Sequence, residues 1–371
     1  MTVRSTIKKG VDYLETSSTE TPFLLLDSAK IRQKARLIGR NISKAEVFYA
    51  VKANSHPEVL ALINQLGLGF EVASEGELRL LLKLGVSPGR IISSNPIKTC
   101  LFLQEAGEAG IGYFAFDTRD EADRLTSFCP GSNVYVRLSV PNEGSQWPLS
   151  KKFGVELEEA RDLLLYAGEA GLSPAGLTFH VGSQCANPYN WDAALDKAAR
   201  LWEMAAKAGL KLNLLNIGGG YPIHYTKDVV EIETIERRID RRVKNIFPPE
   251  IRILLEPGRA VIGDAGLFVT SVIGKANRIG ENWMYLDVGV FNGLMESVGG
   301  IRYSYLSESA GPLRKWTLAG PSCDSFDVID HEIELPEPEI GDHLIILGCG
   351  AYTTCYASEF NGFSIPRTVL V

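Results

Sequence analysis

A lysine and a histidine each follow an apolar run of the sequence. Lys52 closes the run FYAVK, where loss of water would lower the pKa of its amine and favour Schiff-base chemistry. For this lysine alone, a charged end that simply extends into solvent is the simpler interpretation. His180 and Ser183 follow a second run, in FHVGSQ, and a lone histidine there is more often a satisfied polar residue than a catalyst.

Two further runs end in groups that could bind an anion. Gly218, Gly219 and Gly220 offer backbone N–H groups that can approach a phosphate closely, although a flexible turn could have the same sequence. In EPGR, Glu256 and Arg259 could serve a protonated ring nitrogen and a phosphate, or form a surface ion pair. The glycines are no dinucleotide fingerprint, which needs G-x-G-x-x-G between the first strand and helix of a Rossmann unit.

The four runs together indicate one kind of site. A lysine for a Schiff base, a glycine loop and an arginine for a phosphate, and a carboxylate for a pyridinium nitrogen make up most of a pyridoxal phosphate site. Each part is common, and only their combination is specific. These residues can form one site only in a fold that brings the ends of the four apolar runs close together.

Such a fold is predicted by the alternation of strand-length apolar runs with helical patterns from residue 46 to 260, which is typical of parallel βαβ units. Eight strands are expected, at residues 46–51, 69–72, 91–94, 113–116, 133–138, 176–180, 212–217 and 252–255. Eight units in about 215 residues suit a (β/α)8 barrel, whose active sites lie at the carboxyl ends of the strands.

After Arg259, short β-branched and aromatic runs replace the helical patterns. Strands are expected at residues 267–272, 283–286, 316–318, 331–335 and 343–347. We therefore predict an α/β barrel over residues 24–260. A mostly-β domain, a sandwich or barrel, would comprise residues 1–23 together with 261–371.

The composition points to a small-molecule partner. The 371 residues are 45% apolar and carry a net charge of −7 without a Lys/Arg block, which argues against nucleic acid. No apolar run approaches the roughly 20 residues of a membrane span, and no signal peptide is evident, so we expect a cytoplasmic protein. Six cysteines without a C-x-x-C pair indicate free thiols, and no metal site is expected.

The sequence resembles the barrel-type (fold type III) pyridoxal-phosphate decarboxylases of basic amino acids, which act on ornithine, lysine, diaminopimelate or arginine. The resemblance covers nearly the whole chain, and the motifs FYAVKAN, FHVGSQ, IGGGYP, EPGR, GPSCDSFDVI and GAYTTCYASEFNGF occur in the family's order. The resemblance implies an alanine-racemase-like (β/α)8 barrel, pyridoxal 5′-phosphate (PLP) as cofactor, and a homodimer.

The resemblance also implies a role for each cofactor residue. Lys52 would form the Schiff base, His180 would lie against the ring, and Glu256 would pair with the protonated pyridine nitrogen, where the related alanine racemases have an arginine. Arg137 and Glu71 would form a supporting polar pair behind the lysine, although many relatives have aspartate at the latter position. The phosphate contacts would be Ser183, Gly218, Gly219, Gly220, Arg259 and Tyr352, with Gly258 allowing close backbone approach.

The motif GPSCD would supply the remaining chemistry. By resemblance, Cys323 returns a proton to the substrate carbon after CO₂ leaves, Asp324 receives the distal ammonium group, and Phe360 flanks the substrate tail. In the family Cys323 and Asp324 come from the partner subunit, which implies active sites shared across the dimer. A buried core cysteine is the structural alternative for Cys323. The Cys-Asp pair favours the ornithine type over diaminopimelate decarboxylases.

One segment departs from the family pattern. After YLDVGVFNGLMES, ornithine and lysine enzymes usually carry a further acidic residue, where this chain has Val298, Gly299 and Gly300. The distal ammonium group would then be neutralised by Asp324 and, as a second candidate, Glu296. Such a pocket could admit lysine or an unusual diamino acid.

These observations lead to an expected function and two alternatives. We expect PLP-dependent decarboxylation of a basic L-amino acid, foremost ornithine to putrescine and also lysine to cadaverine, in polyamine biosynthesis. A decarboxylase of a modified or unusual diamino acid in a specialised pathway is the first alternative. The second, from another class, is a catalytically inactive protein that resembles antizyme inhibitors, which would have no reason to retain Lys52, Glu256, Arg259, Cys323 and Asp324.

Overall fold

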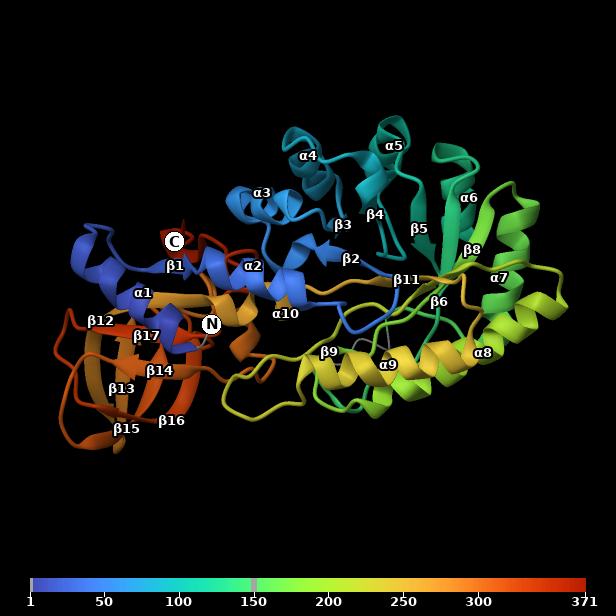
Figure 1. Ribbon diagram of the computed structural model, residues 1–371. Helices are drawn as coiled ribbons and strands as arrows, with labels where there is room; N and C mark the ends of the chain where they lie inside the picture. Colours follow the sequence, from blue (N-terminus) through green and yellow to red (C-terminus); the bar gives the residue numbers. More distant parts are fainter. Residues whose placement is uncertain (1–2, 148–151) are drawn as a thin grey trace. The chain divides into compact units, whose positions relative to one another are not determined.

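Eight parallel strands form one sheet in the computed structural model, which describes residues 3–147 and 152–371 (Figure 1). Along the sheet their order is β4-β3-β2-β11-β10-β8-β6-β5. A bridge between Ser93 and Phe114 joins the two outer strands, so the sheet is a nearly closed barrel. The strands are β2 (Ala45–Ala50), β3 (Gly69–Glu71), β4 (Ile91–Ile92), β5 (Tyr113–Phe116), β6 (Asn133–Arg137), β8 (Ser173–Thr178), β10 (Leu214–Asn216) and β11 (Arg252–Leu255).

The predicted barrel is therefore confirmed, with each strand at its expected place within a few residues. Helices lie between the strands, as the alternating pattern requires, and several begin with a side-chain cap. Ser74, Thr99 and Thr118 each accept a hydrogen bond from a backbone N–H in the first turn. The helices are α3 (Pro57–Gln65), α4 (Glu75–Lys83), α5 (Cys100–Ala109), α6 (Arg119–Phe128), α7 (Leu157–Glu169), α8 (Tyr189–Lys207) and α9 (Ile232–Ile246).

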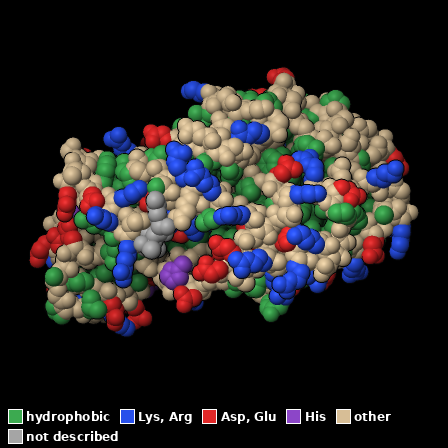
Figure 2. Space-filling view, viewed as in Figure 1, with side chains coloured by type: hydrophobic (Ala, Val, Ile, Leu, Met, Phe, Trp, Pro, Cys, Tyr) green, Lys and Arg blue, Asp and Glu red, His purple; other side chains and the backbone are tan. Residues whose placement is uncertain are grey.

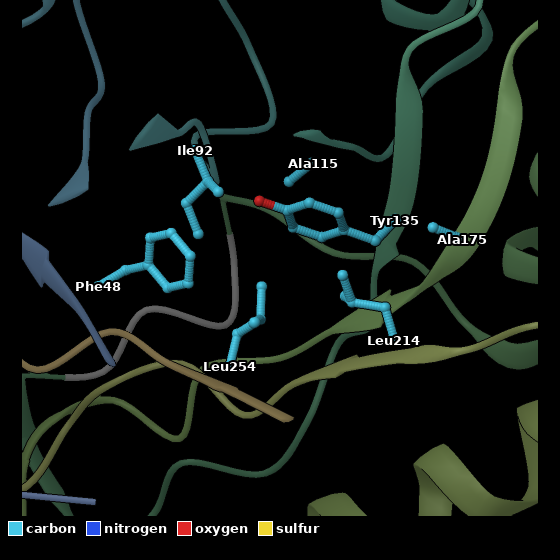
Figure 3. Close-up of a cluster of buried hydrophobic side chains, with 7 residues drawn as sticks. All are labelled: Phe48, Ile92, Ala115, Tyr135, Ala175, Leu214 and Leu254. Carbon is cyan, nitrogen blue, oxygen red and sulfur yellow. The ribbon is translucent and has the colours of Figure 1, made fainter. Parts of the chain in front are cut away.

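The interior of the barrel is filled by side chains from every barrel strand except β3 (Figure 3). Tyr135 crosses this interior and directs its hydroxyl group to Ser94, 2.7 Å away. Full burial of one large apolar side chain stabilises a fold by about 1.5–3 kcal/mol, so this layer holds the strand ends firmly in place. The layer consists of Phe48, Ile92, Ala115, Tyr135, Ala175, Leu214 and Leu254.

The chain divides into two compact units. The barrel unit comprises residues 35–222 and 229–258, and also contains a two-stranded sheet of β7 (Ser145–Trp147) and β9 (Ser183–Cys185). The β unit comprises the described residues up to 34 together with 223–228 and 259–371. The division in the chain between Gly258 and Arg259 falls inside the EPGR motif.

The β unit is built on a second eight-stranded sheet, in the order β14-β17-β12-β13-β15-β16, with β1 pairing with both β12 and β18. The five strands expected here are all present. Three further strands, β1, β14 and β18, were not expected. The strands are β1 (Phe23–Leu26), β12 (Gly266–Arg278), β13 (Glu281–Leu286), β14 (Ser304–Ser307), β15 (Leu313–Ala319), β16 (Val328–Pro336), β17 (His343–Leu347) and β18 (Arg367–Leu370).

Helix α1 (Val3–Thr16) packs against this sheet over a small apolar core formed by Phe23, Leu25, Leu267, Val269 and Ile345. Among the described residues, no helix is long and apolar enough to cross a membrane, and no three histidine, cysteine or acidic side chains are grouped as metal ligands. Basic and acidic side chains are interspersed on the face shown in Figure 2.

Candidate active site

An ion pair lies at the carboxyl ends of β2 and β3. Lys52 belongs to the short 3-10 helix Val51–Ala53 that follows β2, and its Nζ lies 3.0 Å from Oε2 of Glu71. The Lys52 side chain is 49% exposed, so the desolvated lysine that the apolar run suggested is not found. Glu71 is almost fully buried, and its Oε1 has no hydrogen-bond partner among the described residues.

A third titratable group, Glu77, lies beside this pair. Its Oε2 accepts a hydrogen bond of 2.7 Å from the backbone N–H of Ala73. Burial, together with the negative charge of Glu71, raises the pKa of Glu77 to about 7. We did not predict Glu77 as part of the site. Its only signal in the sequence is the spacing Ser74-x-x-Glu77, which is typical of a helix start rather than of catalysis.

Glu256 follows β11 and is held in a buried polar cluster. Its Oε1 accepts hydrogen bonds from Asn216 Nδ2, at 2.5 Å, and from the hydroxyl group of Ser94. Burial and the charge of Glu71 raise the pKa of Glu256, against the effect of these two hydrogen bonds. A buried carboxylate with a raised pKa is stabilised by a positively charged neighbour, so Glu256 is suited to pairing with a protonated ring nitrogen. The sequence did not point to Ser94 or Asn216, although both stand at strand ends of the same rim.

His180 carries no charge at neutral pH. The backbone N–H of Gly182 donates to its Nδ1 at 3.0 Å, so this nitrogen is an acceptor and the ring proton is on Nε2. Burial and the positive charges of Arg137 and Lys52 lower the pKa of His180 to about 3. The neutral imidazole therefore offers a flat face at the end of β8, where an aromatic cofactor ring could stack.

The three glycines form a packed loop rather than a flexible turn. Gly218 and Gly220 have φ of +64° and +94°, which glycine adopts without strain. A Cβ atom at Gly219 would lie 2.4 Å from the backbone oxygen of Glu256, and one at Gly218 equally close to the oxygen of Phe179. Only glycine allows the ends of β8, β10 and β11 to approach so closely.

The remaining barrel residues lie near the same rim. Arg137 ends β6, and the charges of Glu256, Asp117 and Glu71 oppose the lowering of its pKa by burial. Ser183 begins β9. Gly258 is the last residue of the barrel unit, directly after Pro257, whose oxygen accepts a hydrogen bond from the backbone N–H of Ala50.

Within the β unit, Arg259 forms a buried ion pair with Glu296. Each of the two terminal guanidinium nitrogens donates to one carboxylate oxygen, at 2.7 and 2.6 Å, and one of them also donates to the Tyr225 hydroxyl group. Burial alone would lower the pKa of Arg259, but Tyr225 and Glu296 raise it well above its usual value. The Tyr352 ring centroid lies 4.8 Å from the guanidinium carbon. Glu296, a candidate for the substrate ammonium, thus has both oxygens on Arg259.

Cys323 and Asp324 are exposed on the loop between β15 and β16. Cys323 is therefore not a buried core cysteine. The loop is fixed by Asp327, whose carboxylate accepts backbone hydrogen bonds from Val290, at 2.7 Å, and Ser322, at 3.0 Å. Within the same unit, the Phe360 and Phe291 ring centroids are 4.5 Å apart, and Phe291 and Phe326 are 6.2 Å apart, so an aromatic cluster accompanies the loop.

Comparison with known proteins identifies the family. Residues 28–263 match the family model described as the pyridoxal binding domain of pyridoxal-dependent decarboxylases. The chain belongs to this family. A curated relative, the lysine/ornithine decarboxylase of Selenomonas ruminantium, is 37% identical over 356 residues, which cover 94% of this chain and 89% of that protein.

Solved structures of similar proteins agree with this assignment. The structure of SrLDC in complex with PLP and cadaverine has a TM-score of 0.91 and 36% identity, covering 98% of this chain and 93% of that one. The lysine/ornithine decarboxylase of Vibrio vulnificus complexed with putrescine has a TM-score of 0.90 and 32% identity, covering 100% and 99%. The chain is therefore a PLP-dependent decarboxylase.

The described residues fit this cofactor. The buried Oε1 of Glu71, which lacks a hydrogen-bond partner among the described residues, calls for a further polar partner beside Lys52. Glu256 is a buried carboxylate with a raised pKa, and His180 is neutral. PLP has an aldehyde carbon that matches the primary amine of Lys52 and a pyridinium nitrogen that matches the carboxylate of Glu256. Its aromatic ring matches the flat face of His180.

Proposed function

We propose that L-ornithine is the preferred substrate and putrescine the product, with conversion of L-lysine to cadaverine as a second activity. The observation that carries this proposal is the exposed pair Cys323-Asp324, which offers one proton donor and one carboxylate on the same loop. A carboxylate is the natural partner of an ammonium group at the end of a short aliphatic chain. The cadaverine and putrescine complexes of the two solved relatives support a diamine product.

The barrel residues would hold and tune the cofactor. PLP supplies the electron sink that makes loss of CO₂ from the substrate possible. Lys52 would carry the cofactor covalently, and Glu71 would orient the lysine amine through its 3.0 Å ion pair. Glu256, fixed by Ser94 and Asn216, would keep the ring nitrogen protonated, and His180 would support the ring as a neutral stacking partner.

The cofactor phosphate would be bound by the backbone and side-chain donors that the sequence indicated. In the barrel unit we assign Ser183 and the backbone N–H groups of Gly218, Gly219 and Gly220, with Gly258 allowing close approach. In the β unit we assign Arg259 and Tyr352, whose ring lies against the guanidinium group. Glu296 would then act mainly by holding Arg259 in place, because both of its oxygens contact that side chain.

The β15–β16 loop would complete the reaction on the substrate. The thiol of Cys323 would protonate the substrate carbon that has lost CO₂, and Asp324 would bind the distal ammonium group. Phe360 would pack along the aliphatic part of the substrate. Glu296 could reach the ammonium group only by giving up Arg259, so we assign the main charge recognition to Asp324.

We also propose that the active enzyme is a homodimer in which this loop serves the partner's site. Cys323 and Asp324 are exposed in the single chain, and exposed aromatic rings of the β unit accompany them. Large exposed apolar side chains of this kind are typical of a surface that another protein covers. The rings are those of Phe326, Tyr356, Phe360 and Phe363.

A place in polyamine biosynthesis follows from a putrescine or cadaverine product. The cytoplasm is the compartment that we propose, since exposed thiols such as Cys100 and Cys323 persist where disulfides are rare. A decarboxylase of an unusual diamino acid is the second candidate. It is favoured by one observation, the engagement of Glu296 with Arg259 beside the Gly299-Gly300 segment, which leaves less negative charge for a simple ammonium group.

Substitution of Asp324 tests the assignment of the substrate. D324N should lower kcat/KM for L-ornithine by about 30-fold or more, because loss of a close charge partner costs about 2–5 kcal/mol. L-Norvaline, which has the same carbon chain without the distal amine, should react equally poorly with both forms. The neighbouring variant S325A is the matched control. An unchanged kcat/KM for L-ornithine in D324N would exclude Asp324 as the group that recognises the amine.

A further inference from the structure

The side chain of Asn361 contacts the residue that we assign as proton donor. Oδ1 of Asn361 lies 3.3 Å from the backbone nitrogen of Cys323 and 3.4 Å from its Sγ. The two residues are 38 positions apart in the chain and both belong to the β unit. Asn361 therefore has a direct contact with the Cys323 thiol.

The backbone contact decides the direction of the thiol hydrogen bond. A peptide N–H can only donate, so the atom of the Asn361 amide that faces Cys323 must be the oxygen. Because the same oxygen faces Sγ, it accepts the S–H proton. An acceptor at this place stabilises the thiol relative to the thiolate and fixes the direction of the S–H bond.

The backbone of Asn361 offers a simpler reason for its presence, which must be separated from this contact. Its φ of +55° lies in the left-handed region, which asparagine tolerates better than most residues. The turn itself is closed by backbone hydrogen bonds from Gly362 to Glu359, at 2.9 Å, and from Phe363 to Phe360, at 3.2 Å. The side chain of Asn361 takes part in neither, so the turn does not depend on it.

We propose that Asn361 is a positioning residue that accepts a hydrogen bond from the Cys323 thiol and so directs it for proton transfer, an inference that rests on the proposed function. In the transfer the S–H bond breaks and the proton joins the substrate carbon, which retains the electron pair left by CO₂, to form a C–H bond. The resulting thiolate regains a proton from solvent. Asn361 itself neither gains nor loses a proton.

The test compares two variants that keep the left-handed backbone, N361D and N361G, with the wild type. The measurement is the alkylation rate of Cys323 by iodoacetamide as a function of pH, followed by mass spectrometry in the full enzyme with cofactor. Cys100, exposed in the barrel unit, serves as internal reference. S358A, in the same segment, is the control variant, since the hydrogen bonds of Ser358 in the described structure go to the backbone oxygen of Phe291.

Opposite shifts are expected from the two variants. N361D places a negative charge beside the thiol and should raise the midpoint of the pH–alkylation curve by about 1 pH unit or more. N361G removes the acceptor and should lower the midpoint by about 0.5 pH unit. Midpoints that are the same in the wild type, N361G and N361D would show that Asn361 serves only the turn, and would overturn the proposal.

Turnover gives a second, independent readout. N361G should complete fewer turnovers before it loses activity, because the substrate carbon then receives its proton less reliably. An equal number of turnovers in N361G and S358A would contradict the proposal. Alkylation requires no substrate, so failure of the enzyme to release CO₂ from any amino acid would count against the proposed function and not against the role of Asn361.

Discussion

Glu296 places both carboxylate oxygens on the guanidinium group of Arg259, at 2.6 and 2.7 Å, with both side chains almost fully buried. The pair lies wholly within the β unit, and Tyr225 and Tyr352 pack around it. A buried cation of this kind is tolerated only with its partner in place. The relationship therefore makes Glu296 a residue on which the stability of the unit depends.

Removal of the Glu296 carboxylate should destabilise the enzyme strongly. E296A leaves the buried Arg259 charge without its partner, which costs about 3–5 kcal/mol in comparable cases. The measurement is the free energy of unfolding in urea without cofactor. K315A is the control, since Lys315 and Glu332 form an exposed pair in the same unit and no measurable change is expected. An equally small change in E296A would contradict the buried pair.

The low pKa of His180 should make stability depend on pH. Unfolding returns its pKa from about 3 to its ordinary 6.5, so the unfolded chain binds about one more proton between these values. The wild type should therefore gain about 1.4 kcal/mol per pH unit over H180N as the pH rises from about 3 to 6.5, and no more above that. Unfolding titrations of both forms without cofactor measure this. A difference that does not change with pH would mean that the pKa of His180 is not lowered in the folded protein.

Glu77 should make the stability of the fold depend on pH in the opposite direction. Its pKa is raised from 4.5 to about 7, so the folded protein binds the extra proton, and ionisation above pH 4.5 weakens the fold. E77Q should gain on the wild type by about 1.4 kcal/mol per pH unit between about pH 4.5 and 7. In the wild type the His180 and Glu77 effects oppose each other between pH 4.5 and 6.5. The two variants must therefore be measured separately. If the difference in unfolding free energy between E77Q and the wild type does not change with pH, the raised pKa of Glu77 is excluded.

Shared active sites predict complementation between two inactive variants. K52A lacks the cofactor lysine and C323A lacks the proton donor. If each site takes Lys52 from one subunit and Cys323 from the other, a random mixture should recover about a quarter of the wild-type sites, because half of the dimers then hold one intact site. The measurement is CO₂ release after the mixed subunits are dissociated and reassociated. Activity no greater than that of the separate variants would exclude sharing.

Much of the fold was predictable because its signals are local. The barrel strands are apolar runs, and the stretches between them have apolar residues at helical spacing. Both patterns are visible in a short window of the sequence. The strands that were missed lack such a signal. In β1, the apolar run FLLL lies before the alternation of strands and helices that begins at residue 46, and β14 has only four residues, SYLS.

The site was predictable where its residues stand at strand ends, and not where their partners lie far along the chain. Lys52 and Glu256 follow apolar runs, and a barrel brings such ends together. The contact of Ser94 with Glu256 joins residues 162 positions apart, which no spacing reveals. Glu296 was assigned to the substrate for the same reason, since its pairing with Arg259 depends on how the β unit folds.

The most direct test of the account is CO₂ release by the PLP-loaded enzyme from L-ornithine, L-lysine, L-arginine, 2,4-diaminobutyrate, diaminopimelate and the D-isomers, with identification of each product amine. We predict the highest kcat/KM for L-ornithine, with putrescine as product, followed by L-lysine with cadaverine. No CO₂ from any of these amino acids, with the cofactor still bound to Lys52, would contradict the assignment of a simple basic amino acid as substrate.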